Sequence, residues 1–97
     1  MAIKVIVELQ AKPGRRAELK GLVEKLAASQ DPGHSGYLGS TFYENLDNPD
    51  MLIDIADWES PEARMAHLEE SMATGAYAPV LEILAAPFRA TVIRQLS

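Results

Sequence analysis

The 97-residue sequence predicts an α+β fold in which one antiparallel sheet carries helices on a single face. Three observations lead to this prediction. Strand-like alternation occurs near both ends of the chain, two adjacent strand-like segments lie in the middle, and amphipathic helical segments separate them. The predicted order is β-α-β-β-α-(α)-β. A chain of this length corresponds to one domain, residues 1–97.

The N-terminal part of the chain predicts a strand followed by a helix. Residues 2–11 alternate with a period of two and place four apolar side chains on one side: Ile3, Val5, Val7 and Leu9. Residues 12–29 change to a helical period, with one apolar stripe formed by Leu19, Leu22, Val23 and Leu26. Pro13 is expected in the first turn of this helix, where a missing N–H costs little.

The middle of the chain predicts a hairpin and the end predicts helices and a last strand. Residues 37–46 and 51–58 form the two hairpin strands, and residues 47–50 connect them. Ser60, followed by Pro61 and Glu62, predicts the start of a second helix that runs to about Ser71. Residues 75–87 predict another short helix, and residues 88–97 a final strand. This order is the split βαβ arrangement of ferredoxin-like folds.

The sheet face away from the helices is predicted to be apolar. Met51, Ile53 and Ile55 share one face of the third strand, and Ile6 interrupts the polar face of the first. A large exposed apolar face on a monomer usually marks an interface. We therefore predict a homodimer in which two sheets pack face to face, the alternative being a monomer whose loops cover this face.

Composition excludes several classes of function. The net charge is −5, and no basic stretch is present, so nucleic acid and anionic membrane surfaces are poor partners. The absence of cysteine excludes disulfides, thiolate metal sites and a cysteine nucleophile. Two histidines far apart in sequence, His34 and His67, are a poor nucleus for a metal site, and His34 is expected in solvent. We expect a cytoplasmic protein that does not associate with membranes.

The only tryptophan, Trp58, ends the third strand, and His67 follows nine residues later on the second helix. Three interpretations compete. In the first, Trp58 packs in the core and His67 is either a surface residue or a buried residue with its hydrogen bonds satisfied. In the second, His67 is a general base, since its free pKa near 6.5 suits that role. In the third, the pair lines a cavity for a flat organic ligand that stacks on the indole. The residues alone leave all three open.

Residues 57–71, DWESPEARMAHLEES, resemble the signature of the antibiotic biosynthesis monooxygenase domain family. The segments LQAKPGRRAEL and GYLGSTFYENLDNPD resemble its first strand, turn and helix and its glycine-led second strand and hairpin, so the resemblance covers nearly the whole chain. It implies a dimeric α/β barrel of two ferredoxin-like units, with a pocket between sheet and helices in each subunit.

The resemblance also implies a chemistry. Characterised members oxidise aromatic polyketides or quinols with dioxygen, using no metal or flavin, because the deprotonated substrate itself supplies the electron to oxygen. This implies a cofactor-independent monooxygenase whose partners are dioxygen and a small phenolic, quinol or polyketide-type aromatic, with no cofactor. The alternative is a non-catalytic small-molecule-binding or assembly domain on the same scaffold. Haem degradation is a weaker third interpretation, because Val7 occupies the position of the asparagine in the haem-degrading branch.

Candidate site residues follow from both lines of reasoning. His67 and Asp54 are the candidate catalytic bases; Asp54 lies four residues before Trp58, where polyketide-oxidising members have asparagine, and unlike asparagine it can accept a proton. Trp58, Tyr43 and Tyr77 are the candidate substrate-binding residues. Tyr43 alternates with Tyr37 and Thr41 on one predicted face of the second strand, and Tyr77 opens the short helix. No residue is assigned to a cofactor or a metal.

Overall fold

The computed structural model of the chain describes residues 2–28 and 36–96, so His34 lies outside the described residues. Within them, the elements follow one another as β1 (Ile3–Gln10), α1 (Arg16–Ala28), β2 (Tyr37–Asn45), β3 (Asn48–Trp58), α2 (Pro61–Thr74), α3 (Ala78–Glu82) and β4 (Arg89–Ile93). This order confirms the predicted β-α-β-β-α-α-β arrangement.

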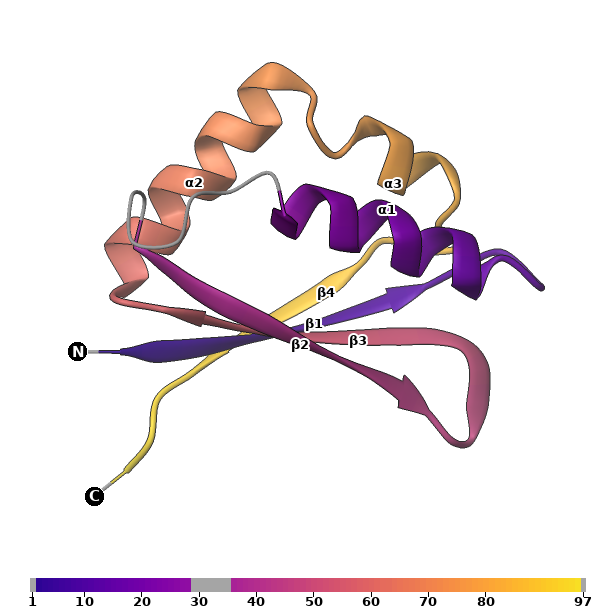
Figure 1. Cartoon of the computed structure of the whole chain (residues 1–97), viewed down its shortest axis with the longest axis horizontal. Helices are drawn as coiled ribbons and strands as arrows, with labels where there is room; N and C mark the ends of the chain where they lie inside the picture. The colour runs from indigo at the N-terminus through magenta and orange to yellow at the C-terminus, as the bar shows by residue number, and fades with distance from the viewer. Residues whose placement is uncertain (1, 29–35, 97) are drawn as a thin grey trace.

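The four strands form one sheet in the order β2-β3-β1-β4, and every neighbouring pair is antiparallel. The helices α1, α2 and α3 all lie on the same side of this sheet (Figure 1). The predicted ferredoxin-like fold is therefore confirmed. In the register between the central strands, Ile3 faces Trp58, Val7 faces Asp54 and Leu9 faces Leu52. The first strand thus runs alongside the residues that carry the candidate site.

The last helix and last strand are shorter than predicted, α3 spanning Ala78–Glu82 and β4 spanning Arg89–Ile93. The predicted hairpin turn and the predicted start of the first helix are also wrong, and local hydrogen bonds explain both. The hairpin turn consists of residues 46–47 and not 47–50, because the Asn45 side chain accepts hydrogen bonds from the backbone N–H groups of Asp47 (2.8 Å) and Asn48 (3.2 Å). Helix α1 begins at Arg16, beyond Pro13. Gly14 has a positive φ of 77° and donates its N–H to the Asp50 side chain at 3.0 Å, so this segment is a turn.

Helix α2 begins where the sequence predicts. The hydroxyl of Ser60 accepts a hydrogen bond from the N–H of Ala63 at 3.1 Å, and Pro61 follows in the first helical position. The helix extends to Thr74, beyond the predicted end near Ser71, and Gly75 terminates it in the left-handed conformation. No helix in the described part of the chain is long and apolar enough to cross a membrane.

The hydrophobic core consists of two clusters between the sheet and the helices. One contains Leu9, Leu19 and Leu52 together with residues of α3 and of the segment that follows it, and the other is built around Val5, Tyr37, Ala56 and Trp58. Val7 packs against both clusters. The core is therefore continuous along β1 but divided elsewhere, and this division makes room for a cavity.

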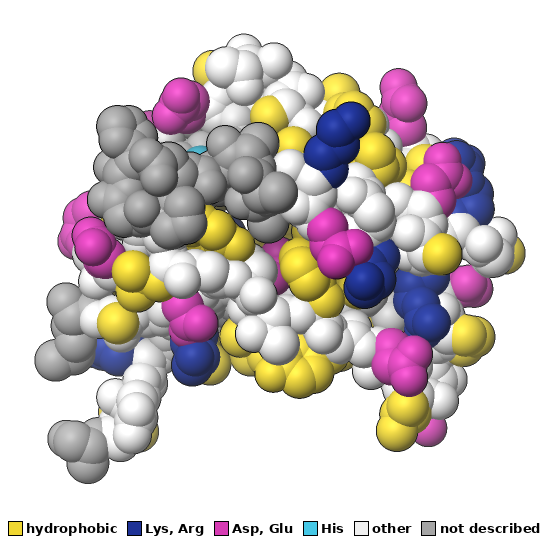
Figure 2. All heavy atoms as spheres, in the orientation of Figure 1, with side chains coloured by type: hydrophobic (Ala, Val, Ile, Leu, Met, Phe, Trp, Pro, Cys, Tyr) yellow, Lys and Arg dark blue, Asp and Glu magenta, His cyan; other side chains and the backbone are white. Residues whose placement is uncertain are grey.

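The opposite face of the sheet carries apolar side chains that are not covered within the monomer. Ile6 pairs with Ile55, and both are partly exposed, as are Met51 and Ile53 on the same face. Figure 2 shows hydrophobic side chains along the lower edge of the molecule, on the side of the sheet away from the helices. The apolar character predicted for this face is confirmed.

Candidate active site

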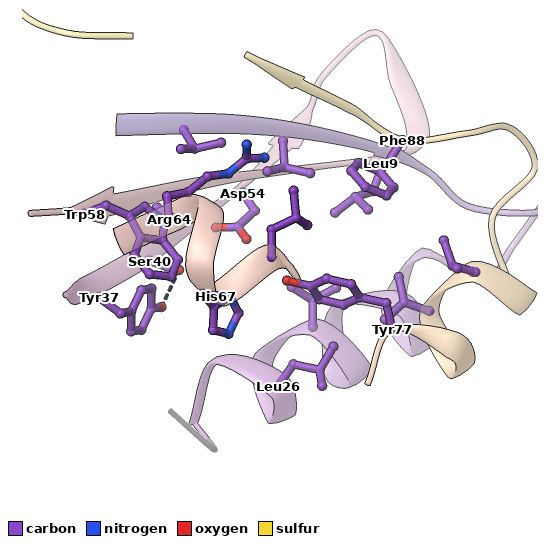
Figure 3. A pocket seen from close by; sticks show the side chains of 17 residues that line it. Leu9, Leu26, Tyr37, Ser40, Asp54, Trp58, Arg64, His67, Tyr77 and Phe88 are labelled. Atoms are coloured by element: carbon purple, nitrogen blue, oxygen red, sulfur yellow. Dashed lines mark hydrogen bonds between the residues drawn. The ribbon is translucent and has the colours of Figure 1, made fainter. Parts of the chain in front are cut away.

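A cavity of about 120 Å³ lies between the inner face of the sheet and the helices (Figure 3). Its lining side chains come from β1, β2 and β3 on one side, from α1, α2 and α3 on the other, and from Phe88 just before the last strand. Segments from both halves of the chain therefore build the cavity, which is the position that the resemblance implies for a pocket.

The periodicities of β3 and α2 bring the three main candidates together. Asp54 and Trp58 lie on the same side of β3 because side chains alternate along a strand, and both line the cavity. On α2, Arg64 lies about one turn before the consecutive residues His67 and Leu68, and all three line the cavity as well. The ring centroids of Trp58 and His67 are 5.2 Å apart at an interplanar angle of 45°. The residues expected to share one cavity do share it.

The side of α2 that faces the cavity is not the side with the most hydrophobic side chains. Met65 and Met72 are 45% and 58% exposed, whereas Ser71 is buried and His67 is half-buried. The helix thus directs Arg64, His67 and Ser71 inward beside Leu68. A packed core would favour Met65 and Met72 in these positions, so this arrangement indicates that α2 contributes polar groups to an otherwise apolar cavity.

Asp54 is the most perturbed group in the cavity. Its Oδ1 atom is buried and has no hydrogen-bonding partner in the described structure. Burial raises the pKa of this carboxyl from its usual 3.8 to about 6, although hydrogen bonding from Ser40 acts in the opposite direction. At neutral pH the group is therefore mainly ionised, yet it holds a proton far more readily than an exposed aspartate. A buried carboxylate whose Oδ1 atom has no partner can accept a proton from a ligand.

Ser40 connects Asp54 to a tyrosine at the end of the cavity. The hydroxyl groups of Ser40 and Tyr37 are hydrogen-bonded to each other (Figure 3). Burial raises the pKa of Tyr37, so this phenol stays protonated at neutral pH. The ring of Tyr37 also packs against Trp58, with centroids 5.2 Å apart. The carboxylate thus lies next to two fixed hydroxyl groups, whereas its Oδ1 atom remains available.

His67 is held in a neutral form beside the indole. Burial lowers the pKa of its imidazole, the positive charge of Arg64 lowers it further, and Glu70 acts in the opposite direction. The Nε2 atom lies 3.3 Å from the hydroxyl of Ser71. A neutral imidazole can donate or accept one hydrogen bond at each nitrogen, so His67 can orient a polar group of a ligand without carrying charge.

Tyr77 lines the cavity, as expected, but Tyr43 does not. A bulge between Tyr37 and Gly39 shifts the register of β2 by one residue. Ser40 and Phe42 consequently share the inner face with Tyr37, whereas Tyr43 pairs with Ile53 on the outer face and is 49% exposed. The prediction for Tyr43 is wrong because a shift of one residue moves every following side chain to the other face.

The same bulge explains why Ser40 was not among the predicted site residues. The signal in the sequence was Gly39, which has a φ of 135° that other residues rarely adopt, since glycine inside a strand often marks a bulge. Arg64 and Phe88 line the cavity as well. The sequence does not identify them, because it does not show which turn of α2, or which residue of the segment between α3 and β4, faces inward. Among the described residues, no group of three or more histidine, aspartate or glutamate side chains is arranged to hold a metal ion.

The comparisons with known proteins agree with this geometry. The family model for antibiotic biosynthesis monooxygenases matches residues 2–78. The chain belongs to this family. No curated protein matches the chain significantly.

Solved structures that resemble this family member cover it almost completely. A candidate antibiotic biosynthesis monooxygenase from Chloroflexus aurantiacus is 25% identical with a TM-score of 0.73, covering 100% of this chain and 97% of that chain. Rv0793 from Mycobacterium tuberculosis is 23% identical with a TM-score of 0.78, covering 100% and 97%. A variant of SnoaB, a cofactor-independent oxygenase from Streptomyces nogalater, is 14% identical with a TM-score of 0.78, covering 99% and 94%. At 23% and 14% identity, the structures of Rv0793 and SnoaB show that the fold is shared.

Proposed function

We propose that this protein is a cofactor-independent monooxygenase that oxidises a small phenolic or quinol-type aromatic with dioxygen. The observation that carries the proposal is the buried Oδ1 atom of Asp54, which has no partner in the described structure and lies in a cavity walled by Trp58. Family membership supports the same reaction class, as does the similarity in fold to SnoaB, a cofactor-independent oxygenase.

In the proposed reaction, the phenol O–H transfers its proton to Asp54, leaving an electron-rich phenolate in the cavity. The phenolate is the reductant and dioxygen is the oxidant. One oxygen atom forms a new bond to a ring carbon that loses its hydrogen, and the other leaves as water, so that the product is a quinone. The balance is therefore one phenol and one dioxygen giving one quinone and one water. The protein contributes the base, the orientation of the ring and the exclusion of bulk water.

Oxygen uptake with a panel of phenols and hydroquinones tests the role of the carboxylate. Asp54→Asn keeps the shape of the side chain but removes the base, and we expect turnover to fall by about 10²–10⁴-fold. Asp57→Asn is the matched control. It changes the same residue type on the same strand, but Asp57 forms an ion pair with Lys4 at 2.5 Å and does not line the cavity. Equal losses in the two variants would contradict the role of Asp54.

The pH dependence of wild-type turnover provides a second readout. Because only the ionised carboxylate accepts a proton, turnover should fall as the pH decreases through about 6, the pKa of Asp54. His67→Ala separates the two candidate bases: unchanged turnover would leave His67 with a packing role beside Trp58. If wild-type protein binds the phenols but consumes no oxygen, the alternative of a non-catalytic binding domain is favoured.

The haem interpretation receives less support from the site. A cavity of about 120 Å³ is well below the roughly 300–1,000 Å³ of pockets that enclose drug-sized ligands, and haem is larger than most of those. The His67 ring also packs against Trp58 and interacts with Ser71 through Nε2. A Soret band that appears on haem titration and disappears in His67→Ala would reverse this preference.

The assembly that we propose is a homodimer formed through the outer face of the sheet. The apolar rows around Ile6 and Ile55 support it, because an exposed patch of this kind usually marks an interface. Ile55→Lys should convert a dimer to a monomer, as measured by light scattering after size-exclusion chromatography. Leu46→Lys, which changes an 89% exposed residue at the hairpin turn, should leave the mass unchanged. The cytoplasmic location remains a prediction.

A further inference from the structure

The cavity has two chemically different ends, with Asp54 between them. Toward one end, beyond Asp54 along β3, lie Trp58 and the hydroxyl groups of Tyr37 and Ser40, with Arg64 above (Figure 3). The register of the sheet fixes the opposite direction. Val7 faces Asp54, and Leu9 lies two residues further from Trp58 along β1.

The second end of the cavity is lined mainly by hydrocarbon side chains: Leu9, Val23, Leu26, Val80, Leu81 and Phe88. Several of them belong to the hydrophobic cluster under α1 and α3. Tyr77 also lines this part of the cavity, and its hydroxyl oxygen points away from Leu9 and Phe88 (Figure 3). A polar group placed there would lose hydrogen bonds to water with no side-chain partner to replace them, whereas an aliphatic group would gain from burial. The cavity is therefore complementary to a ligand that is polar at one end and aliphatic at the other.

The volume limits how much of a ligand the cavity can enclose. An engineered apolar cavity of about 150 Å³ binds a single benzene molecule. The cavity of this protein, at about 120 Å³, is of that order and leaves little room for fused ring systems. The space therefore suits one aromatic ring, with a substituent that extends toward the hydrocarbon side chains at the second end of the cavity.

We propose that the ligand is a single-ring phenol or hydroquinone that carries an aliphatic substituent. Its ring hydroxyl lies at Oδ1 of Asp54 and its substituent lies against Leu9 and Phe88. The assignment of the hydroxyl rests on the proposed function, in which Asp54 removes a proton. The preference for one ring and an aliphatic substituent rests on the lining and volume of the cavity, and applies whether or not the ligand is oxidised.

Trp58 allows the proposal to be tested without turnover. It is the only tryptophan of the chain, it is 5% exposed, and it lines the cavity, so its fluorescence reports on occupancy. Binding would be measured anaerobically for a series of 4-alkylphenols of increasing chain length. We expect affinity to rise by about fourfold for each methylene until the apolar end is filled. An analogue with a terminal hydroxyl in place of a methyl should lose most of this gain, and the three-ring compound anthrone should bind weakly.

A pair of phenylalanine variants locates the substituent. Phe88→Leu enlarges the apolar end and should move the optimum toward longer alkyl chains. Phe42→Leu is the matched control, because Phe42 is also half-buried and packs against the same cluster but does not line the cavity. Both changes are conservative, so both variants are expected to fold, which a circular dichroism spectrum would verify.

The outcomes separate this inference from the proposed function. Affinity that is independent of chain length, anthrone binding as tight as that of the best alkylphenol, or equal effects of Phe88→Leu and Phe42→Leu would each overturn the ligand class. Absence of any fluorescence response to the alkylphenols would overturn it too. Tight, chain-length-dependent binding without oxygen consumption would instead refute the oxygenase function and leave the ligand class in place.

Discussion

Replacing Asp54 by asparagine should stabilise the protein at alkaline pH while it removes the proposed base. Burial makes the ionised form of this carboxyl unfavourable and raises its pKa from 3.8 to about 6. An acid with a higher pKa in the folded chain than in the unfolded chain binds more protons when folded. Folding stability contributed by Asp54 therefore decreases as the pH rises from about 4 through 6. Asparagine has no such cost, because it stays neutral.

The size of the effect follows from the two pKa values. At about 1.36 kcal/mol for each pH unit, the difference between 3.8 and about 6 sets an upper limit of about 3 kcal/mol. Asp54 is only partly buried, so solvent screening reduces this to about 1–2 kcal/mol. For a domain of this size, such a gain corresponds to a rise in Tm of about 5–10 °C.

The assay is thermal and urea-induced unfolding of wild type and Asp54→Asn at several pH values and at one fixed protein concentration, since association would make Tm depend on concentration. We expect the variant to be more stable at about pH 8 and the difference to shrink as the pH falls below about 4, because the carboxyl is protonated in both states only below both pKa values. Asp57→Asn should show no comparable gain, because its ion pair with Lys4 is exposed. A constant difference across the pH range, or a less stable Asp54→Asn at pH 8, would refute the reasoning.

Three further predictions concern local interactions. Ser40→Ala should raise the pKa of Asp54 above about 6, because it removes the hydrogen bond that lowers it; a carbon-13 NMR titration of the carboxyl would measure this, and an unchanged or lower value would contradict it. Gly36→Ala should cost at least about 1 kcal/mol more than Gly14→Ala in urea unfolding. Both glycines have positive φ, but only at Gly36 would a Cβ lie 2.5 Å from a side-chain carbon of α2. Ser60→Ala should cost about 1 kcal/mol through loss of the N-cap; a loss below a few tenths would show that the cap is dispensable.

Much of the fold was predictable because it depends on local patterns. The alternation of Ile3, Val5 and Leu9 and the capping sequence at Ser60 are properties of short segments, and the structure contains both. The placement of Trp58 and His67 at one cavity was one of three interpretations that the residues left open, and the family resemblance implied the pocket; the two rings are 5.2 Å apart in the structure. The predicted helix start at Pro13 and the predicted turn at residues 47–50 are wrong because side-chain hydrogen bonds set these boundaries. Asp50, from another segment, binds the N–H of Gly14, and Asn45, next to the turn, binds the N–H of Asp47.

By itself, the sequence determined the order of the elements, the side of β3 that carries Asp54 and Trp58, and the apolar outer face of the sheet. Only the tertiary structure decided that Ser40 replaces Tyr43 at the site, because a bulge in β2 reverses which residues point inward. It also decided the chemistry of Asp54. A pKa depends on burial and on neighbours brought from β1, β2 and α2, and these come together only when helices pack on the sheet.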